Sequence, residues 1–194
     1  MSDVADEMLL EKVKTGDRGA FDALYEKYKR PIMTYAMRLI GNRETAEEVA
    51  QETFLKVYLH AAQFSPRGKV SSWIYTIASN LAKNALRDRR YFRDLSLEMV
   101  LKESEAAARL WQIIADTRPG PEADLAAKEL DEAIQKVLAT MPPRFREVLI
   151  LCDLQGLPYE EVGRIIGSSI GTVASRLSRA RQLFMKRFGG RPPL

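Results

Sequence analysis

Apolar residues recur three and four positions apart along most of this chain of 194 residues, the spacing that gives an α-helix one apolar face. No stretch of useful length alternates apolar and polar side chains as a strand would. Glycine and proline residues interrupt the pattern and separate its helical segments. The predicted fold class is therefore all-α. The predicted helices span residues 4–15, 18–40, 43–62, 73–90, 122–140, 143–154, 158–166 and 170–188.

Local signals add detail to the helix boundaries. Pro31 lies inside the second predicted helix, where its missing N–H predicts a kink or a break. Thr45 and Glu48 have the spacing of a capping box at the start of the third helix. Ser71 or Ser72 is the predicted N-cap of the fourth helix.

The helical pattern weakens between the fourth and fifth predicted helices. This stretch ends in "RPGP", a strong helix breaker, and its middle, "ESEAAARLWQII", could form a short helix. The predicted organisation is an N-terminal domain at residues 1–93, a flexible linker at 94–120 and a C-terminal domain at 121–194. Both domains are expected to be small and helical.

The net charge is only +4, but the charged residues are distributed unevenly. Residues 176–191 hold six Lys or Arg and no acid, and residues 83–93 hold five against one Asp. Residues 44–52 hold four Glu. Two basic patches and one acidic patch predict polyanion contacts at two places and a different partner at the third. The alternative is that each charged run is a solvated face.

Several function classes are disfavoured by the residues present. The acidic start, "MSDVADEM", lacks the basic and apolar segments of a secretory signal, and no apolar run is long enough to span a membrane. We therefore expect a cytoplasmic protein without membrane insertion. We see no glycine-rich phosphate loop, paired carboxylates or metal-ligand spacing; His60 lies at a predicted helix end, and Cys152 lies in an apolar run. No enzymatic activity, catalytic residue, cofactor, metal or small-molecule substrate is expected.

The last two predicted helices have the pattern of a helix-turn-helix. A short helix and a turn opening with Gly167 precede a final helix whose core stripe is Val173, Leu177, Ala180 and Phe184. A different face of that helix carries polar and cationic side chains suited to base edges and phosphates. The predicted duplex-DNA contacts are Ser169, Thr172, Ser175, Arg176 and Arg179. The alternative is a helical hairpin with a basic outer face.

The third predicted helix has two stripes. One is apolar and faces the predicted core, and the other combines acids with two leucines. This second stripe consists of Glu48, Gln51, Glu52, Leu55 and Leu59. Leucines among acids on an outward face fit a protein partner that is apolar at its centre and basic at its rim. The alternative is a solvated acidic face.

The fourth predicted helix also has two faces, and its polar face suggests single-stranded DNA. Ile74, Ile77, Leu81 and Ala85 face the predicted core. Aromatic, amide and cationic side chains gather elsewhere, where bases could stack on a ring and amides could read their edges. These residues are Trp73, Thr76, Asn80, Lys83, Asn84 and Arg87. The alternative is that Trp73 belongs to the core.

Four segments, taken together, resemble a known family. "LPYEEVGRIIGSSIGTVASRLSRARQLF" resembles the C-terminal promoter-reading domain of extracytoplasmic-function (ECF) sigma factors of bacterial RNA polymerase. "AFDALYEKY", "AEEVAQETFLKVY" and "VSSWIYTIASNLAKNALRDRRY" resemble their N-terminal domain. The resemblance spans residues 5–188 and is weakest in the linker. The family usually has a basic residue where this chain has Ala174, and a small polar cap where it has Pro158.

The resemblance implies partners and roles for these faces. The partner of the third helix would be the clamp helices of the large polymerase subunit. The fourth helix and the preceding loop, "QFSPRGKVSS", would read and trap melted bases of the minus-ten element, which adds Phe64 and Lys69 to the single-strand contacts. The last helix would read the minus-thirty-five element, and the linker would lie inside polymerase near the RNA path. An anti-sigma factor is a common partner in this family.

The function predicted from the sequence is that of an ECF sigma factor, which binds core polymerase and directs promoter-specific transcription initiation under the control of an anti-sigma factor. One alternative is an autonomous helix-turn-helix regulator, which would bind its promoter tightly without polymerase. Another is a helical adaptor or sequestering protein with no DNA function. Charge reversal in the last helix would leave such a protein unaffected.

Overall fold

The computed structural model describes residues 2–65, 68–95 and 121–188, and these ranges contain helices and no strand. The predicted all-α fold is confirmed. The helices are α1 (Ser2–Lys14), α2 (Arg18–Ile40), α3 (Arg43–Leu59), the short 3-10 helix η1 (Ala61–Gln63), α4 (Val70–Leu95), α5 (Pro121–Thr140), α6 (Pro143–Leu149), the π-helical turn η3 (Ile150–Leu154), α7 (Tyr159–Ile166) and α8 (Ile170–Arg187).

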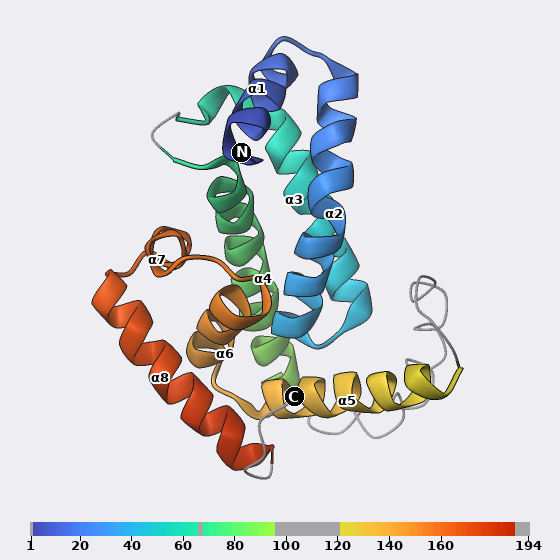
Figure 1. Ribbon diagram of the computed structural model, residues 1–194, viewed down its shortest axis with the longest axis vertical. Helices are drawn as coiled ribbons and strands as arrows, with labels where there is room; N and C mark the ends of the chain where they lie inside the picture. Colours follow the sequence, from blue (N-terminus) through green and yellow to red (C-terminus); the bar gives the residue numbers. More distant parts are fainter. Residues whose placement is uncertain (1, 66–67, 96–120, 189–194) are drawn as a thin grey trace.

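The first four helices form an N-terminal lobe around apolar side chains. Leu24, Ile32 and Tyr35 of α2 are fully buried, as are Val57 of α3 and Ile74 of α4. Helix α4 runs through the middle of the molecule, with α2 and α3 on one side and α6 and α7 on the other (Figure 1). It therefore contacts both halves of the chain.

Helices α5–α8 form the C-terminal lobe. Val162 of α7 and Val173 and Leu177 of α8 are buried in its interior. Helix α5 crosses one end of the molecule, where it contacts α2 and α8 (Figure 1). The buried apolar residues of the two lobes belong to one continuous cluster, so the lobes pack directly against each other.

The start of α3 differs from the predicted capping box. Asn42 is the N-cap, and its side-chain oxygen accepts a hydrogen bond from the Thr45 backbone N–H at 2.9 Å. The Thr45 hydroxyl donates to the same oxygen at 2.8 Å. Because the helix begins at Arg43, Thr45 lies too far inside it to be the cap. The capping-box prediction was wrong, although the predicted start of the helix was right.

Two other boundary predictions also differ from the structure. Helix α2 continues through Pro31, so the predicted break is absent; Ile32 and Tyr35, which follow the proline, are fully buried and fix this part of the helix in the core. Helix α4 begins at Val70, three residues before the predicted start. Ser72 therefore lies inside the helix, and its hydroxyl bonds to Glu161 of the other lobe instead of capping α4.

The predicted linker lies mostly outside the described residues. Helix α4 extends to Leu95, and the structure describes the chain again from Pro121, where α5 begins. The short helix considered for "ESEAAARLWQII" falls in the range that is not described. The domain boundaries remain predictions.

Candidate polymerase and nucleic-acid interfaces

The outward stripe of α3 is exposed along its whole length. Leu55 and Leu59 keep 57% and 63% of their surface accessible, which is unusual for leucine. On the opposite side of the helix, Phe54 and Val57 are buried against the rest of the lobe. The exposed stripe consists of Glu48, Gln51, Glu52, Leu55 and Leu59. The structure thus brings together all five residues predicted to bind polymerase.

The turn between α7 and α8 depends on two glycines. Gly167 ends α7 in the left-handed region, at φ 64°, which glycine adopts without a steric penalty. A methyl group at Gly163 would lie 2.7 Å from the carbonyl oxygen of Ser168, so only glycine allows the turn to fold back this closely. Ser169 then caps α8, accepting a hydrogen bond from the Thr172 N–H at 3.2 Å. These contacts fix the angle between the two helices.

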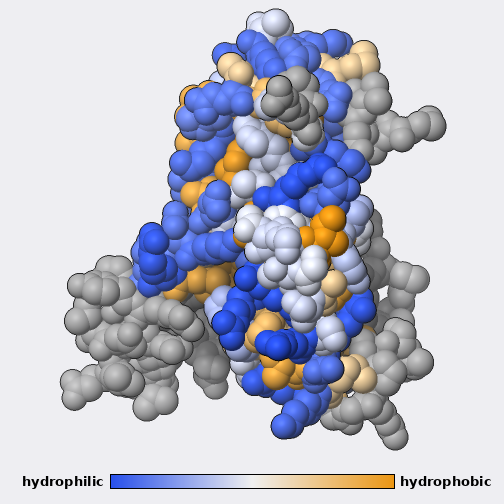
Figure 2. Space-filling view, turned by 90° about the vertical axis from the view of Figure 1, so that its left-hand side faces the viewer, coloured by the Kyte–Doolittle hydropathy of each residue, from blue (hydrophilic) through white to orange (hydrophobic). Residues whose placement is uncertain are grey.

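The polar face of α8 is reachable from solvent, but its two arginines differ. Ser175 and Arg179 are exposed. Arg176 is half-buried and donates to the Ser168 hydroxyl at 3.3 Å. It also lines a cavity of about 200 Å³ between the lobes, together with Lys83, Arg144 and Glu147. The face that carries α7 and α8 is largely hydrophilic, with small separate hydrophobic areas (Figure 2).

The structure accommodates both departures from the usual family pattern. Pro158 is the N-cap of α7 and makes no side-chain cap bond; its φ of −59° suits the residue before a helix. Ala174 is exposed on α8. Sequence reasoning missed the neighbouring Ile170, whose side chain is exposed at the start of α8. An apolar side chain at this end of the helix could contact a thymine methyl group.

The predicted single-strand contacts of α4 fall into exposed and covered groups. Asn80, Asn84 and Arg87 are exposed, whereas Trp73, Thr76 and Lys83 are half-buried. Phe64 is only 6% accessible and packs against Trp73, with 5.4 Å between the two ring centroids. In this conformation the Phe64 ring belongs to the core and presents no face to a base. Its contact with DNA stays a prediction.

Two buried glutamates of the C-terminal lobe pair with lysines on and just before α4. Glu147 of α6 accepts hydrogen bonds from the hydroxyls of Tyr35 at 3.2 Å and Ser79 at 2.6 Å, and Lys83 Nζ lies 3.0 Å away. Burial and the negative charge of Glu147 raise the pKa of Tyr35 well above its usual value, so its hydroxyl remains a donor.

Glu161 of α7 makes the corresponding contact nearer the start of α4. It accepts a hydrogen bond from the Ser72 hydroxyl at 3.0 Å and pairs with Lys69 at 2.6 Å. A third bond joins the same surfaces, from the Tyr75 hydroxyl to Gln155 at 2.6 Å. Sequence reasoning missed these contacts. The one available signal was that Glu147 and Glu161 stand among apolar residues that face a core.

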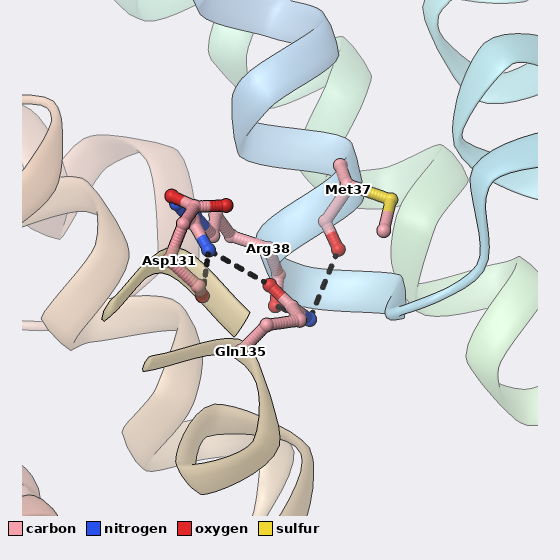
Figure 3. Close-up of polar contacts among 4 residues, drawn as sticks. All are labelled: Met37, Arg38, Asp131 and Gln135. Atoms are coloured by element: carbon pink, nitrogen blue, oxygen red, sulfur yellow. Dashed lines mark hydrogen bonds and ion pairs between the residues drawn. The ribbon is translucent and has the colours of Figure 1, made fainter. Parts of the chain in front are cut away.

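The far end of α2 is joined to the C-terminal lobe by a second set of polar contacts. Arg38 pairs with Asp131 of α5 and donates to Gln135 at 3.3 Å, while Gln135 donates to the carbonyl oxygen of Met37 (Figure 3). Nearby, the buried Arg146 guanidinium donates to the Leu39 carbonyl at 2.7 Å. Cationic and amide donors at this position compensate the carbonyls left unpaired at a helix C-terminus.

The described residues offer no sign of a metal centre or a reactive thiol. They contain no group of three or more His, Cys, Asp or Glu placed to hold a metal ion. Burial, with a smaller contribution from Asp153, raises the pKa of Cys152 to about 11, which keeps the thiol protonated and weakly nucleophilic at neutral pH. In the same ranges, each helix is too short or too polar to cross a bilayer.

Comparison with known families and proteins matches each of the two lobes to a region of the sigma-70 family. Residues 24–91 match the family described as Sigma-70 region 2, and residues 131–184 match Sigma-70, region 4. The ECF RNA polymerase sigma factor SigW of Bacillus subtilis is 33% identical over 93% of this chain and 97% of its own length. The ECF sigma-E factor of Escherichia coli is 30% identical, with 92% of each chain covered.

Two solved structures share the fold. CnrH in complex with the cytosolic domain of CnrY has a TM-score of 0.69 at 20% identity, with 94% of this chain and 96% of that chain covered. The sigma factor RpoE in complex with the anti-sigma factor NepR from Bartonella quintana has a TM-score of 0.67 at 23% identity, with 86% and 95% covered.

Proposed function

Because the chain belongs to the ECF sigma factors of bacterial RNA polymerase, we propose that its three exposed or partly exposed helix faces divide the tasks of promoter recognition. Helix α3 would bind core polymerase, α8 would read duplex DNA at the minus-thirty-five element, and α4 would hold the melted minus-ten strand. The chemistry of RNA synthesis would belong to polymerase, and the protein would act in the cytoplasm.

The observation that carries this proposal is the exposed stripe of α3. Two leucines that are more than half accessible lie among acids on a helix whose other side is fully packed. Leaving this much apolar surface in water is unfavourable, and a partner that covers the leucines would recover that free energy. The acids Glu48 and Glu52 would select a partner with a basic rim. The clamp helices of the large polymerase subunit are the proposed partner.

The proposed duplex contacts on α8 are Ser169, Thr172, Ser175, Arg176 and Arg179. Their support is the rigid turn held by Gly163 and Gly167, which sets α8 as the second helix of a helix-turn-helix. The proposed single-strand contacts are Phe64, Lys69, Trp73, Thr76, Asn80, Lys83, Asn84 and Arg87. Their support is the exposed amides of α4 and the cations beside them.

We also propose that an anti-sigma factor controls the protein. The related-fold structure of the sigma factor RpoE with the anti-sigma factor NepR is a complex of this kind. The two alternative readings are not favoured. An autonomous regulator or a helical adaptor would need neither of the two sigma-70 regions, and both are present here.

The α3 assignment can be tested with Glu52→Lys, which reverses a charge at the centre of the exposed stripe. Like charges facing each other across an interface are strongly unfavourable, so affinity for core polymerase should fall by about tenfold or more. The matched control is Glu26→Lys on α2. Glu26 is also exposed and also pairs with a lysine of its own helix.

Both variants should unfold within about 0.5 kcal/mol of the unmodified protein, because both positions are on the surface. Affinity is measured by titrating labelled protein with core polymerase. Equal affinity of the Glu52 and Glu26 variants would contradict the assignment of α3.

A further inference from the structure

We propose that the cavity beside Arg176 is a binding site for a small phosphate monoester, and that its ligand competes with promoter DNA for two side chains. The first part of the proposal concerns the cavity alone. The second part rests on the proposed function, because the two side chains, Lys83 and Arg176, are assigned there to single-stranded and duplex DNA.

The cavity has a volume of about 200 Å³, and helices α2, α4, α6, α7 and α8 all contribute to its lining. The lining side chains fall into an apolar group and a charged group. The apolar residues are Leu39, Leu86, Pro143 and Ile166, and the charged residues are Lys83, Arg144, Glu147 and Arg176. An apolar wall with a few convergent charged groups is the usual composition of a site for a small ligand.

The charged group holds three cations and one carboxylate. The carboxylate, Glu147, already accepts hydrogen bonds from two hydroxyls and pairs with Lys83 at 3.0 Å. Within the described part of the chain, neither Arg144 nor Arg176 has an acidic partner, and Arg176 donates to the Ser168 hydroxyl at 3.3 Å. Two guanidinium groups at the cavity are therefore available to an anion.

Charge and volume together define the class of ligand. Two uncompensated guanidinium groups match a dianion, and a guanidinium binds phosphate oxygens through two parallel hydrogen bonds. Sites for drug-sized ligands measure about 300–1,000 Å³, so a cavity of about 200 Å³ is too small for a nucleotide. A phosphate group on a short carbon chain fits, with the chain against the apolar wall. A backbone phosphate of DNA is a diester with one charge and two sugars, and it matches neither the charge nor the volume.

The ligand would act on DNA binding through the side chains that it shares with DNA. The bond from Arg176 to Ser168 is long, at 3.3 Å, and the Lys83 side chain is 41% accessible, so both side chains can exchange partners. A guanidinium that holds a ligand phosphate does not contact a base at the same time. Ligand and promoter therefore weaken each other's binding by the same factor.

The site is tested by isothermal titration calorimetry on the full chain, with inorganic phosphate, butyl phosphate and dimethyl phosphate as probes. At about pH 8 the monoester carries two negative charges. Butyl phosphate should bind about tenfold more tightly than inorganic phosphate, because the apolar wall takes its carbon chain. Dimethyl phosphate, a diester with one charge, should bind about tenfold more weakly than inorganic phosphate. Equal affinities for the three probes would overturn the proposed site.

Variants show whether the probe binds in the cavity. Arg144→Gln removes a cation of the lining and should weaken butyl phosphate binding about tenfold. Its matched control is Arg164→Gln, because Arg164 is exposed on the same lobe and does not line the cavity. Leu86→Phe reduces the space without changing any charge and should also weaken binding.

An anion attracted only to surface cations would bind the Arg144 and Arg164 variants equally and would bind the Leu86→Phe protein in full. Either result overturns the site. If the Leu86→Phe protein does not fold, the comparison of the two arginine variants decides, because both positions are exposed.

Run-off transcription with core polymerase tests the competition with DNA. Arg144 is not among the residues assigned to DNA, so Arg144→Gln should leave transcription without ligand unchanged. Saturating butyl phosphate should inhibit the unmodified and Arg164→Gln proteins, and it should inhibit the Arg144→Gln protein much less. Equal inhibition of all three, or no inhibition despite binding, overturns the competition. If Arg176→Ala still lowers transcription in that case, the assignment of Arg176 to DNA stands and only the competition has failed.

Discussion

The two helices assigned to promoter DNA differ in what covers them. On α8, Ser175 and Arg179 face solvent. On and just before α4, the cations Lys83 and Lys69 are paired with glutamates from the opposite lobe. The two surfaces carry similar chemistry, and each has exposed and covered members: Asn80, Asn84 and Arg87 of α4 are exposed, whereas Arg176 of α8 is half-buried beside the cavity between the lobes. The difference lies in the cations, because those of α4 are held in ion pairs across the two lobes.

This difference bears on which contacts each surface can make. Asn80, Asn84 and Arg87 of α4 are open to solvent, whereas Lys69 and Lys83 are already paired with carboxylates.

The largest expected effect comes from Gly163→Ala. This substitution should distort the turn before α8 and so disturb the face of α8 assigned to duplex DNA. The added methyl group would lie 2.7 Å from a backbone oxygen that cannot easily move, and overpacking of this kind costs about 1–3 kcal/mol. Urea unfolding should show this loss, and transcription that depends on the minus-thirty-five element should fall with it.

Gly171→Ala is the control for that change. A methyl group at Gly171, in the first turn of α8, would meet no atom within 4 Å. Alanine is favoured over glycine inside a helix by about 0.5–1 kcal/mol, so this variant should be slightly more stable than the unmodified protein. Equal stability of the two alanine variants would show that the close approach at Gly163 does not fix the turn.

The next effect distinguishes the two arginines of α8. Arg176→Ala should reduce run-off transcription most from the strongest minus-thirty-five sequence and reduce discrimination among its variants, since a base contact contributes about 1–3 kcal/mol of specificity. Arg179→Ala should lower transcription from all variants more evenly and reduce its salt dependence, as for a phosphate contact. An equal loss on every sequence for Arg176→Ala would make it a phosphate contact.

The smallest expected effect is on the free energy of unfolding, when one cation is removed from each of the two faces assigned to DNA. Lys83→Ala leaves buried Glu147 without its ammonium partner, but the Lys83 side chain is 41% accessible and water screens the pair. We expect a loss of about 1 kcal/mol. Arg179→Ala should change stability by less than about 0.5 kcal/mol.

Asn80→Ala is the matching substitution on the exposed part of α4. Because Asn80 is exposed, its loss should weaken DNA binding without lowering the free energy of unfolding. Both Lys83→Ala and Asn80→Ala should reduce opening of the promoter, which permanganate footprinting of the bubble measures. A normal bubble with both variants would contradict the assignment of α4 to the melted strand.

The sequence predicted the faces of individual helices well, because a helical period determines which side chains lie together. The exposed stripe of α3 and the turn at Gly167 follow from spacing alone. The contacts of Glu147 did not, since its partner Tyr35 is 112 positions away and no local pattern links them. For the same reason Ser71 or Ser72 was assigned to a helix cap, although Ser72 bonds to Glu161, 89 positions away. Phe64 was expected to be available to bases because of the family resemblance, and the structure packs it against Trp73.

The central claim is that the exposed stripe of α3 binds core polymerase. The most direct measurement is the affinity of the Glu52→Lys protein for core polymerase, compared with the affinity of the Glu26→Lys control. We predict a loss of about tenfold or more for Glu52→Lys and no loss for Glu26→Lys. Equal affinity of the two variants would contradict the claim.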